Sequence, residues 1–310
     1  IYSRRQTGGN TWQDDVPRRN SAIDRLEGLV HERPDQAPRV ARLLSVDLRE
    51  LSGADEVPAQ THRYIRAHAL MYPKGGSMPL SAEEAAQELD VTVADISLAA
   101  LRTWAYTLKP RSDMENAVQT LGRLRAIAGV DADAVTIDLR AANLQGIDFE
   151  GGNFNRARLE GAQLQRATLW HTQMEGADLR NAQMQGVYLM LTQMQGADLS
   201  WAQMQGADIR STKFDAQTKL PLADLAGAAI HHTDLSALNV SPKQLEATFG
   251  DRSVTLPSPF MWPRPWPNET LGAYFYTRWR AFQGPAHKPQ LVCVCLRSRV
   301  IFVIFTSRVY

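Results

Sequence analysis

A large apolar side chain returns at every fifth position between residues 139 and 214. The residue two positions before each of them is smaller, most often Ala or Thr. An amphipathic helix spaces its apolar residues three and four positions apart, and a half-buried strand alternates them every second position. The period of five therefore excludes both as the main element of this region. The apolar series is Leu139, Leu144, Phe149, Phe154, Leu159, Leu164, Leu169, Met174, Leu179, Met184, Leu189, Met194, Leu199, Met204, Ile209 and Phe214.

A second, longer period contains four of these five-residue units. Residues 176–186 read GADLRNAQMQG and residues 196–206 read GADLSWAQMQG, so the same pattern returns 20 residues further on (176 to 196). Internal repetition of this kind is the signature of a solenoid, in which each unit stacks on the next. The sequence therefore predicts a coil that closes after four short segments.

The units GADLR, GADLS and AANLQ resemble the pentapeptide-repeat family. In that family, four units form one square turn of a right-handed β-helix. The resemblance covers residues 137–218 and implies a mainly β solenoid with α-helices: a right-handed quadrilateral β-helix preceded by an N-terminal helical region.

The inward-facing residues follow from the repeat. Adjacent turns stack about 4.7–4.9 Å apart, so each large apolar residue is expected to contact its copy 20 residues along the chain. Thr172, Thr192 and Thr212 are expected to form a hydroxyl ladder at one corner, bonded to the backbone. The predicted core ladders are Leu139/Leu159/Leu179/Leu199, Leu144/Leu164/Met184/Met204, Phe149/Leu169/Leu189/Ile209 and Phe154/Met174/Met194/Phe214.

The period changes phase after Phe214. From Leu220 to Val240 the apolar residues keep their spacing but are shifted by one position. Lys219 and Pro221 are therefore predicted to lie at a bulge. The whole repeat makes about five turns, or about 24 Å of solenoid. Both ends of such a stack expose unpaired strands, so both are expected to be capped.

The remaining segments differ in composition from the repeats. A helix at 113–127 is expected to cover the first turn with Val118, Leu121, Leu124 and Ile127. The predicted organisation is a linker or disordered segment at 1–20, a helical region at 21–128 that begins at Ser21, the β-helix at 129–240, a C-terminal helical cap at 241–256, and a Pro/Trp-rich strap with an unexplained apolar tail at 257–310.

The segment at 257–283 is rich in Pro and aromatic residues. It is expected to pack over the solenoid wall, because exposed Trp lowers solubility; binding of a partner is the alternative. The run VIFVIF at 300–305 is β-prone and uncharged, which favours aggregation where it is exposed.

The sequence contains no pattern typical of catalysis or of cofactor and metal binding. The seven histidines show no metal-ligand spacing, and His231 and His232 fall at positions expected to face solvent. No nucleophile elbow, phosphate loop or dinucleotide fingerprint occurs. We therefore expect no enzyme, no cofactor, no metal site and no small-molecule substrate.

An apolar patch is predicted on the outside of the solenoid, with one further residue near an adjacent corner. Exposed apolar clusters with a polar rim often mark contact surfaces. The alternative is that the strap or the N-terminal helices of the same chain cover the patch. The candidate residues are Trp170, His171, Tyr188, Met190 and Leu191, with Trp201 near the adjacent corner.

Two functions are compatible with these features. The first is a structural or protein-interaction module that binds an unknown protein partner or a second copy of itself. The second, suggested by the resemblance, is mimicry of DNA toward a type II topoisomerase. Mimicry needs a strongly anionic surface, whereas residues 137–218 hold seven bases and nine acids, a net charge of −2 (7 − 9). We therefore favour the first function and expect no binding of nucleic acid.

Location depends on what precedes the first residue. The chain begins at Ile1 and not at Met, and its flanks resemble those of bacterial pentapeptide-repeat proteins, several of which carry N-terminal membrane helices. We expect a bacterial cytoplasmic protein, with a membrane tether before Ile1 as the alternative.

Overall fold

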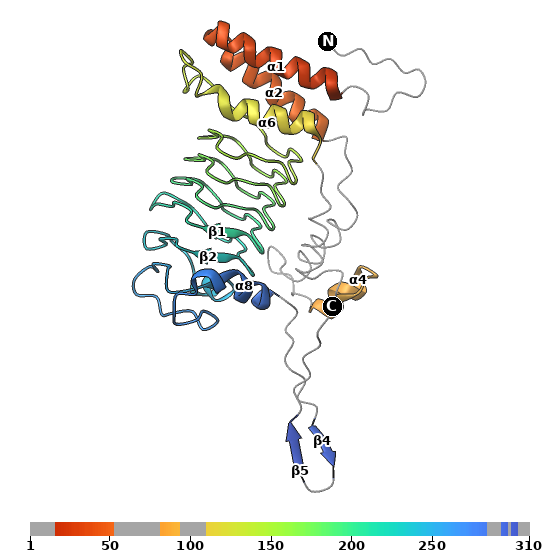
Figure 1. Ribbon diagram of the computed structural model, residues 1–310, viewed down its shortest axis with the longest axis vertical. Coiled ribbons are helices and arrows are strands. Elements are labelled where there is room, and N and C mark those ends of the chain that lie inside the picture. The colour runs from red at the N-terminus through yellow and green to blue at the C-terminus, as the bar shows by residue number, and fades with distance from the viewer. Residues whose placement is uncertain (1–15, 53–80, 94–109, 284–292, 297–298, 303–310) are drawn as a thin grey trace.

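Three helices lie across one end of a stack of coils in the computed structural model, which describes residues 16–52, 81–93, 110–283, 293–296 and 299–302 (Figure 1). Within these ranges, no helix is long and apolar enough to cross a membrane. The helical elements before the coils are α1 (Val16–Glu32), η2 (Pro34–Gln36), α2 (Ala37–Ser52), α4 (Ala82–Glu88) and α6 (Ser112–Leu124).

The helix α1 begins earlier than the predicted start at Ser21. Its second residue is Pro17, and a proline in the first turn of a helix loses no hydrogen bond, because the first N–H groups have no partner within the helix. The helical region predicted at 21–128 is otherwise found in α1, α2, α4 and α6; residues 53–80 and 94–109 lie outside the described residues.

The helix α6 closes the first coil, as predicted. Val118, Leu121 and Leu124 are fully buried. The carbonyl of Gly122 accepts a hydrogen bond from Asn153 N at 2.9 Å, and a Cβ atom at Gly122 would lie 2.9 Å from Gly152 Cα. A glycine is therefore needed where the helix touches the coil. From α2, Ser45 Oγ accepts a hydrogen bond from Asp138 N at 3.3 Å.

Parallel bridges join each coil to the next at four places per turn. As far as Gln193↔Lys213, residues paired in this way lie 20 apart in sequence. The first bridge on each of the four sides is Asp138↔Arg158, Asn143↔Gln163, Asp148↔Thr168 and Asn153↔Gln173. The large apolar residues of all four predicted ladders are buried, except Phe214, which is half-buried. Four units per turn and the four core ladders are thus confirmed.

The threonine ladder is also confirmed. Thr172 Oγ1 donates a hydrogen bond to Phe149 O at 3.0 Å, and Thr192 Oγ1 donates one to Leu169 O at 2.6 Å. Thr212 Oγ1 makes the equivalent bond to Leu189 O at 2.7 Å. Each buried hydroxyl therefore ties one coil to the coil before it.

The change of phase is accommodated between residues 213 and 219. Gln193 pairs with Lys213, 20 residues away, whereas Asp198 pairs with Lys219, 21 residues away. Asp215 Oδ1 accepts a hydrogen bond from Gly196 N at 2.8 Å, and Thr218 Oγ1 donates to Met194 O at 3.0 Å. The extra residue thus lies just before the predicted position, and side chains replace the missing backbone pairing there.

The last coils end in a short parallel sheet and a closing segment. The strands of this sheet, in the order β1-β2-β3, are β1 (Asp208–Arg210), β2 (Ala229–His231) and β3 (Phe249–Gly250). The predicted cap is the helix α7 (Pro242–Glu246), begun by a capping box of Ser241 and Gln244. Trp266 is buried beside it and donates a hydrogen bond to Thr248 O at 2.9 Å.

The C-terminal elements lie beyond this cap. They are η4 (Gly272–Tyr274), α8 (Phe275–Gln283) and an antiparallel pair formed by β4 (Cys293–Leu296) and β5 (Arg299–Phe302). The apolar run at 300–305 contributes to β5, and its part after Phe302 lies outside the described residues.

Candidate functional site

Two successive coils place four of the predicted patch residues at one corner. We name Trp170, His171, Met190 and Leu191 the corner surface. His171 N donates a hydrogen bond to Met190 O at 3.1 Å, so the two turns stack directly. Trp170 and Leu191 are each 36% exposed, although both are large and apolar or aromatic. The four side chains thus form one patch on the outside of the coil.

The backbone at this corner disfavours large side chains. His171 has a φ of 55° and Leu191 a φ of 60°, in the left-handed region. A residue with a Cβ atom costs about 1 kcal/mol or more there, and glycine costs least. The equivalent position one coil earlier is Gly151. Since Leu191 does not fill the core, packing gives no reason for a large side chain there.

Tyr188 lies on the side that leads into this corner. It is half-buried, and the guanidinium of Arg166 lies 4.9 Å from the centre of its ring. It is paired with Asp208 in the next coil. The structure thus brings Tyr188 close to the corner surface, as expected.

Trp201 lies elsewhere. Its amide donates a hydrogen bond to Pro221 O at 3.0 Å, in the column of turns that follows the first side of the coil. His171 and Leu191 belong to the column that follows the third side. In a four-sided coil these two corners are diagonally opposite, so the predicted position at an adjacent corner is wrong. Leu222, which is 63% exposed, lies next to Trp201.

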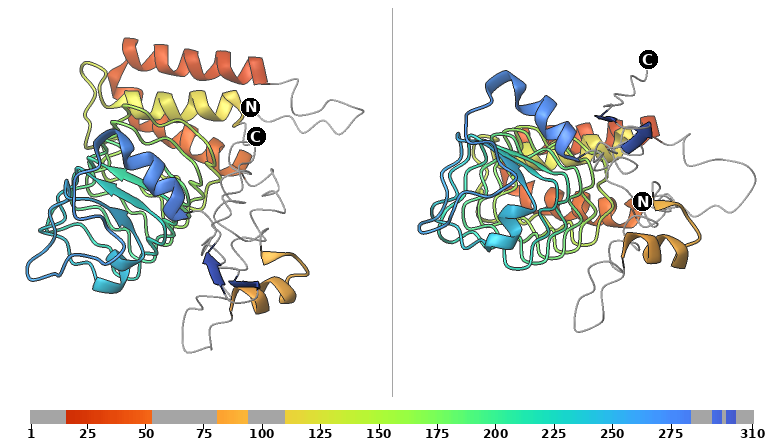
Figure 2. Two further views of the ribbon diagram at one scale, coloured as in Figure 1. Left: turned by 60° about the horizontal axis from the view of Figure 1, so that its bottom comes forward. Right: turned by 90° about the horizontal axis from the view of Figure 1, so that it is seen from below.

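The helix α8 covers the side of the solenoid that carries Tyr188, beginning at Asp208 in the following coil (Figure 2). Tyr276 Oη donates a hydrogen bond to Asp208 Oδ2 at 3.0 Å, and the guanidinium of Arg210 lies 4.3 Å from the centre of the Tyr276 ring. Trp266 and Trp279 are buried. The Pro/Trp-rich segment therefore packs on the solenoid, as predicted, but it leaves Trp170 and Leu191 exposed.

His231 is buried, so the prediction that it faces solvent is wrong. Its ring stacks on Phe275 of α8 at 4.3 Å, and its Nδ1 lies 2.7 Å from Ser253 Oγ and 3.1 Å from Asp251 Oδ1. Burial lowers the pKa of His231, and this effect outweighs that of Asp251, which raises it. His232 is exposed, as predicted.

The Ser253, His231 and Asp251 cluster is not arranged as a catalytic triad. A catalytic triad uses one ring nitrogen for the serine and the other for the carboxylate, whereas here both partners contact Nδ1. The described part of the chain also contains no group of three metal-ligating side chains.

Comparison with known proteins agrees with the repeat geometry. The family model described as "Pentapeptide repeats" matches residues 137–170 and 172–210, in eight copies. This part of the chain consists of pentapeptide repeats. Their coils, joined by parallel bridges, form a β-helix solenoid. No functionally curated protein matches the chain.

Several solved pentapeptide-repeat structures are similar to part of the chain. QnrB1 (M102R, trypsin-treated), a plasmid-mediated fluoroquinolone resistance protein, is 15% identical over 41% of this chain and 64% of its own, with a TM-score of 0.36. A protein from the Arabidopsis thaliana thylakoid lumen is 21% identical over 34% and 67%, with a TM-score of 0.19. HetL from Nostoc sp. PCC 7120, involved in heterocyst differentiation regulation, is 25% identical over 40% and 62%, with a TM-score of 0.17. The chain thus spans about two thirds of each protein, and the similarity is one of fold alone.

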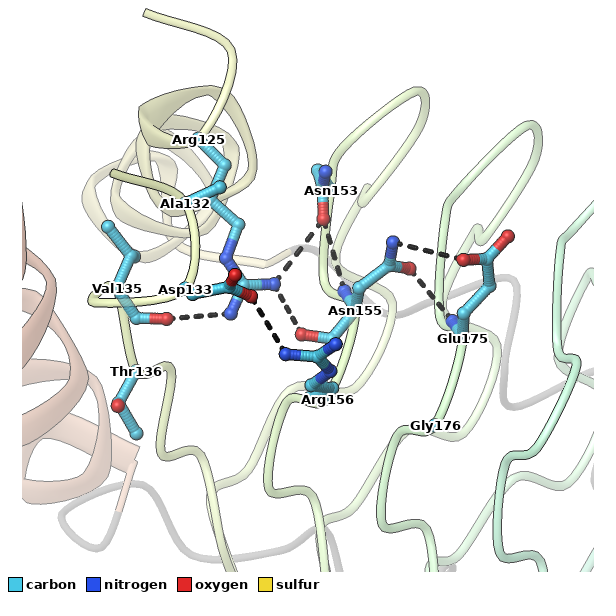
Figure 3. A pocket seen from close by; sticks show the side chains of 10 residues that line it. All are labelled: Arg125, Ala132, Asp133, Val135, Thr136, Asn153, Asn155, Arg156, Glu175 and Gly176. Carbon is cyan, nitrogen blue, oxygen red and sulfur yellow. Dashed lines mark hydrogen bonds and ion pairs between the residues drawn. The ribbon is translucent and has the colours of Figure 1, made fainter. Parts of the chain in front are cut away.

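A cavity of about 390 Å³ lies where the end of α6 meets the first pentapeptide repeats (Figure 3). Arg125, at the end of α6, donates hydrogen bonds to Val135 O at 2.6 Å and to Asn155 O. Arg156 pairs with Asp133 at 2.8 Å. These bonds join groups of the cavity wall to one another, so we interpret the cavity as the joint between cap and coil.

Proposed function

We propose that this pentapeptide-repeat protein is a non-enzymatic scaffold whose right-handed, four-sided β-helix presents the corner surface to a protein partner. One observation carries the proposal: Leu191 is large, exposed and held in a left-handed conformation that favours glycine. Leu222 shares this exposure and conformation, but Leu191 belongs to the four clustered side chains of the corner surface, and it is this cluster that favours contact with another molecule.

The surroundings of the corner surface fit a protein contact. Protein interfaces combine an apolar centre, rich in Trp and Met, with a polar rim. Trp170 and Met190 supply such a centre, and the polar residues Gln173 and Gln193 are paired through their backbones on the neighbouring side of the coil. A second copy of this chain and a different protein are both partners of this chemistry.

The charges along the coils give less support to mimicry of DNA. Asp138 pairs with Arg140 and Asp178 with Arg180, each at 2.7 Å. Paired carboxylates present less negative charge than the unpaired phosphates of a duplex. Protection of DNA gyrase from a quinolone by the purified protein would reverse this preference.

The test replaces Leu191 and Met190 with Asn, and Leu222 serves as the matched control. Leu191 and Leu222 are both exposed leucines with φ near 60°, and Asn tolerates this conformation. We expect Met190→Asn with Leu191→Asn to abolish self-association in light scattering, or capture of a partner by the purified protein, whereas Leu222→Asn has no effect. Equal behaviour of the two variants would contradict the proposal.

A further inference from the structure

The helix α8 docks on the solenoid through three aromatic side chains. Phe275 and Trp279 are buried against Ala229 and Phe249, which are themselves buried residues of β2 and β3. Trp279 Nε1 donates a hydrogen bond to Gly227 O at 2.8 Å. The third side chain, Tyr276, makes the bond to Asp208 described above. The helix therefore occupies a defined site on the wall of the last coils.

This docking site continues the side that carries Tyr188. Asp208, Ala229 and Phe249 succeed Tyr188 along one column of paired residues. Leu191 N donates a hydrogen bond to Arg210 O at 3.0 Å, so the corner surface also runs directly into the covered wall. Removal of α8 would therefore extend the exposed apolar surface by Ala229, Phe249 and the ring of His231.

His231 is the titratable group enclosed by this docking. It is 7% exposed and lies beneath Phe275, and its Nε2 makes no hydrogen bond to any residue that the structure describes. A proton added to the ring would thus place a positive charge beneath Phe275, with Asp251 as its partner at Nδ1. The loss of hydration of this charge under α8 disfavours the docked state, and it outweighs the attraction of Asp251.

Other charged groups face His231 from each neighbouring element. They are Asp208 and Arg210 from β1, His232 beside it, and Asp251 after β3, while α8 contributes Tyr276 next to Asp208. Asp251 favours the charged ring, whereas Arg210 and His232 oppose it. Burial also raises the pKa of Asp208, so protonation of this carboxyl acts in the opposite direction and favours docking at lower pH.

We propose that α8 is an acid-released strap: protonation of His231 frees α8 from the wall and uncovers an aromatic surface next to the corner surface. The inference rests on the proposed function, because it describes regulation of the same side of the solenoid. The surface that α8 uncovers is continuous with the patch that we assign to the partner.

The direction of the pH dependence follows from the position of His231. Its pKa is lower when α8 is docked than the value of 6.5 typical of an accessible histidine. The contribution of the neutral ring to docking is therefore complete above pH 6.5 and is lost as the pH falls toward the lowered pKa. Each unit of difference between the two pKa values weakens docking by a factor of about ten.

The experiment follows the buried indole of Trp279 in the full chain labelled with 5-fluorotryptophan. Its fluorine resonance is assigned by its loss in Trp279→Phe, and the resonance of Trp266, buried at the end of the solenoid, reports on the overall fold. Between pH 8 and pH 5 we expect the Trp279 resonance to move to the value of an exposed indole, while the Trp266 resonance stays in place.

Two variants and a matched histidine separate the strap from general acid unfolding. His231→Phe keeps an aromatic ring under Phe275, and His231→Asn keeps a neutral polar group; at least one of them should hold Trp279 buried down to pH 5. His232→Asn should behave like the wild type. The proposal would be overturned by a Trp279 resonance that does not change with pH. It would also be overturned if this resonance still moved in both His231→Phe and His231→Asn.

The strap and the proposed function can fail independently. If the Asn variants of Met190 and Leu191 associate normally but Trp279 still responds to pH through His231, the strap stands and the corner surface is not the binding site. If those variants lose association and Trp279 does not respond, the corner surface stands and the strap is wrong.

Discussion

The regular coils and the last coils use the same repeat, but they treat their outward positions differently. In the regular coils, Thr168 and Tyr188 are half-buried. Further along the same column, Asp208 and Ala229 are 2% and 0% exposed, because α8 lies on them. The period of five decides which side chains face inward, whereas a distant segment decides which outward side chains meet solvent. The candidate surface is therefore the part of this side that α8 leaves open.

The largest effect is expected from the core of the regular coils. Leu164→Ala removes a fully buried side chain stacked between Leu144 and Met184, and it should lower the free energy of unfolding by about 2–5 kcal/mol. Urea unfolding followed by circular dichroism measures this change. Truncation of the half-buried Tyr188 is the control, and an equal loss there would contradict the distinction between inward and outward positions.

An intermediate effect is expected at the threonine corner. Thr192→Val keeps the shape of the side chain but removes its bond to Leu169 O, so that this buried carbonyl loses a hydrogen-bond donor. The expected loss is about 1–2 kcal/mol in the same assay. Thr168→Val, at an outward position, should change stability by less than about 0.5 kcal/mol. Similar values for the two variants would show that the buried hydroxyl ladder adds little.

The smallest effect is expected at the corner surface. Leu191→Gly relieves the left-handed backbone but adds conformational freedom to the unfolded chain, and these two contributions oppose each other. The net change in unfolding free energy should stay within about 1 kcal/mol of zero. A loss comparable to that of Leu164→Ala would mean that Leu191 supports the fold and that its exposure has no functional meaning.

The sequence was sufficient where structure is local and repeated. The inward ladders, the threonine bonds and the change of phase all follow from the spacing of residues along one coil. The opposite corner of Trp201 also follows from this spacing, since ten residues separate Leu191 from Trp201 and ten residues are two sides of the coil (201 − 191).

The burial of His231 could not be predicted in this way. It depends on Phe275 of α8 and on Asp251, neither of which belongs to the same coil. Asp251 lies one period of 20 residues after His231 (251 − 231), but Phe275 belongs to no repeat, so only tertiary packing brings α8 onto this histidine. The shape of the Arg125 cavity has the same origin, because Arg125, the residue that follows α6, there meets the carbonyl of Asn155 in the first coil.

The enlarged coil at residues 214–218 bears on how such a protein changes over evolutionary time. One additional residue lengthens a single corner, while Asp215 and Thr218 anchor the loop to the coil before it. The sides that follow stay paired with the coil before them, with partners now 21 residues apart in sequence, as in Asp198↔Lys219 and Asp208↔Ala229. A short insertion at a corner is thus absorbed where it occurs, and a lineage could add a longer recognition loop there without redesigning the rest of the rod.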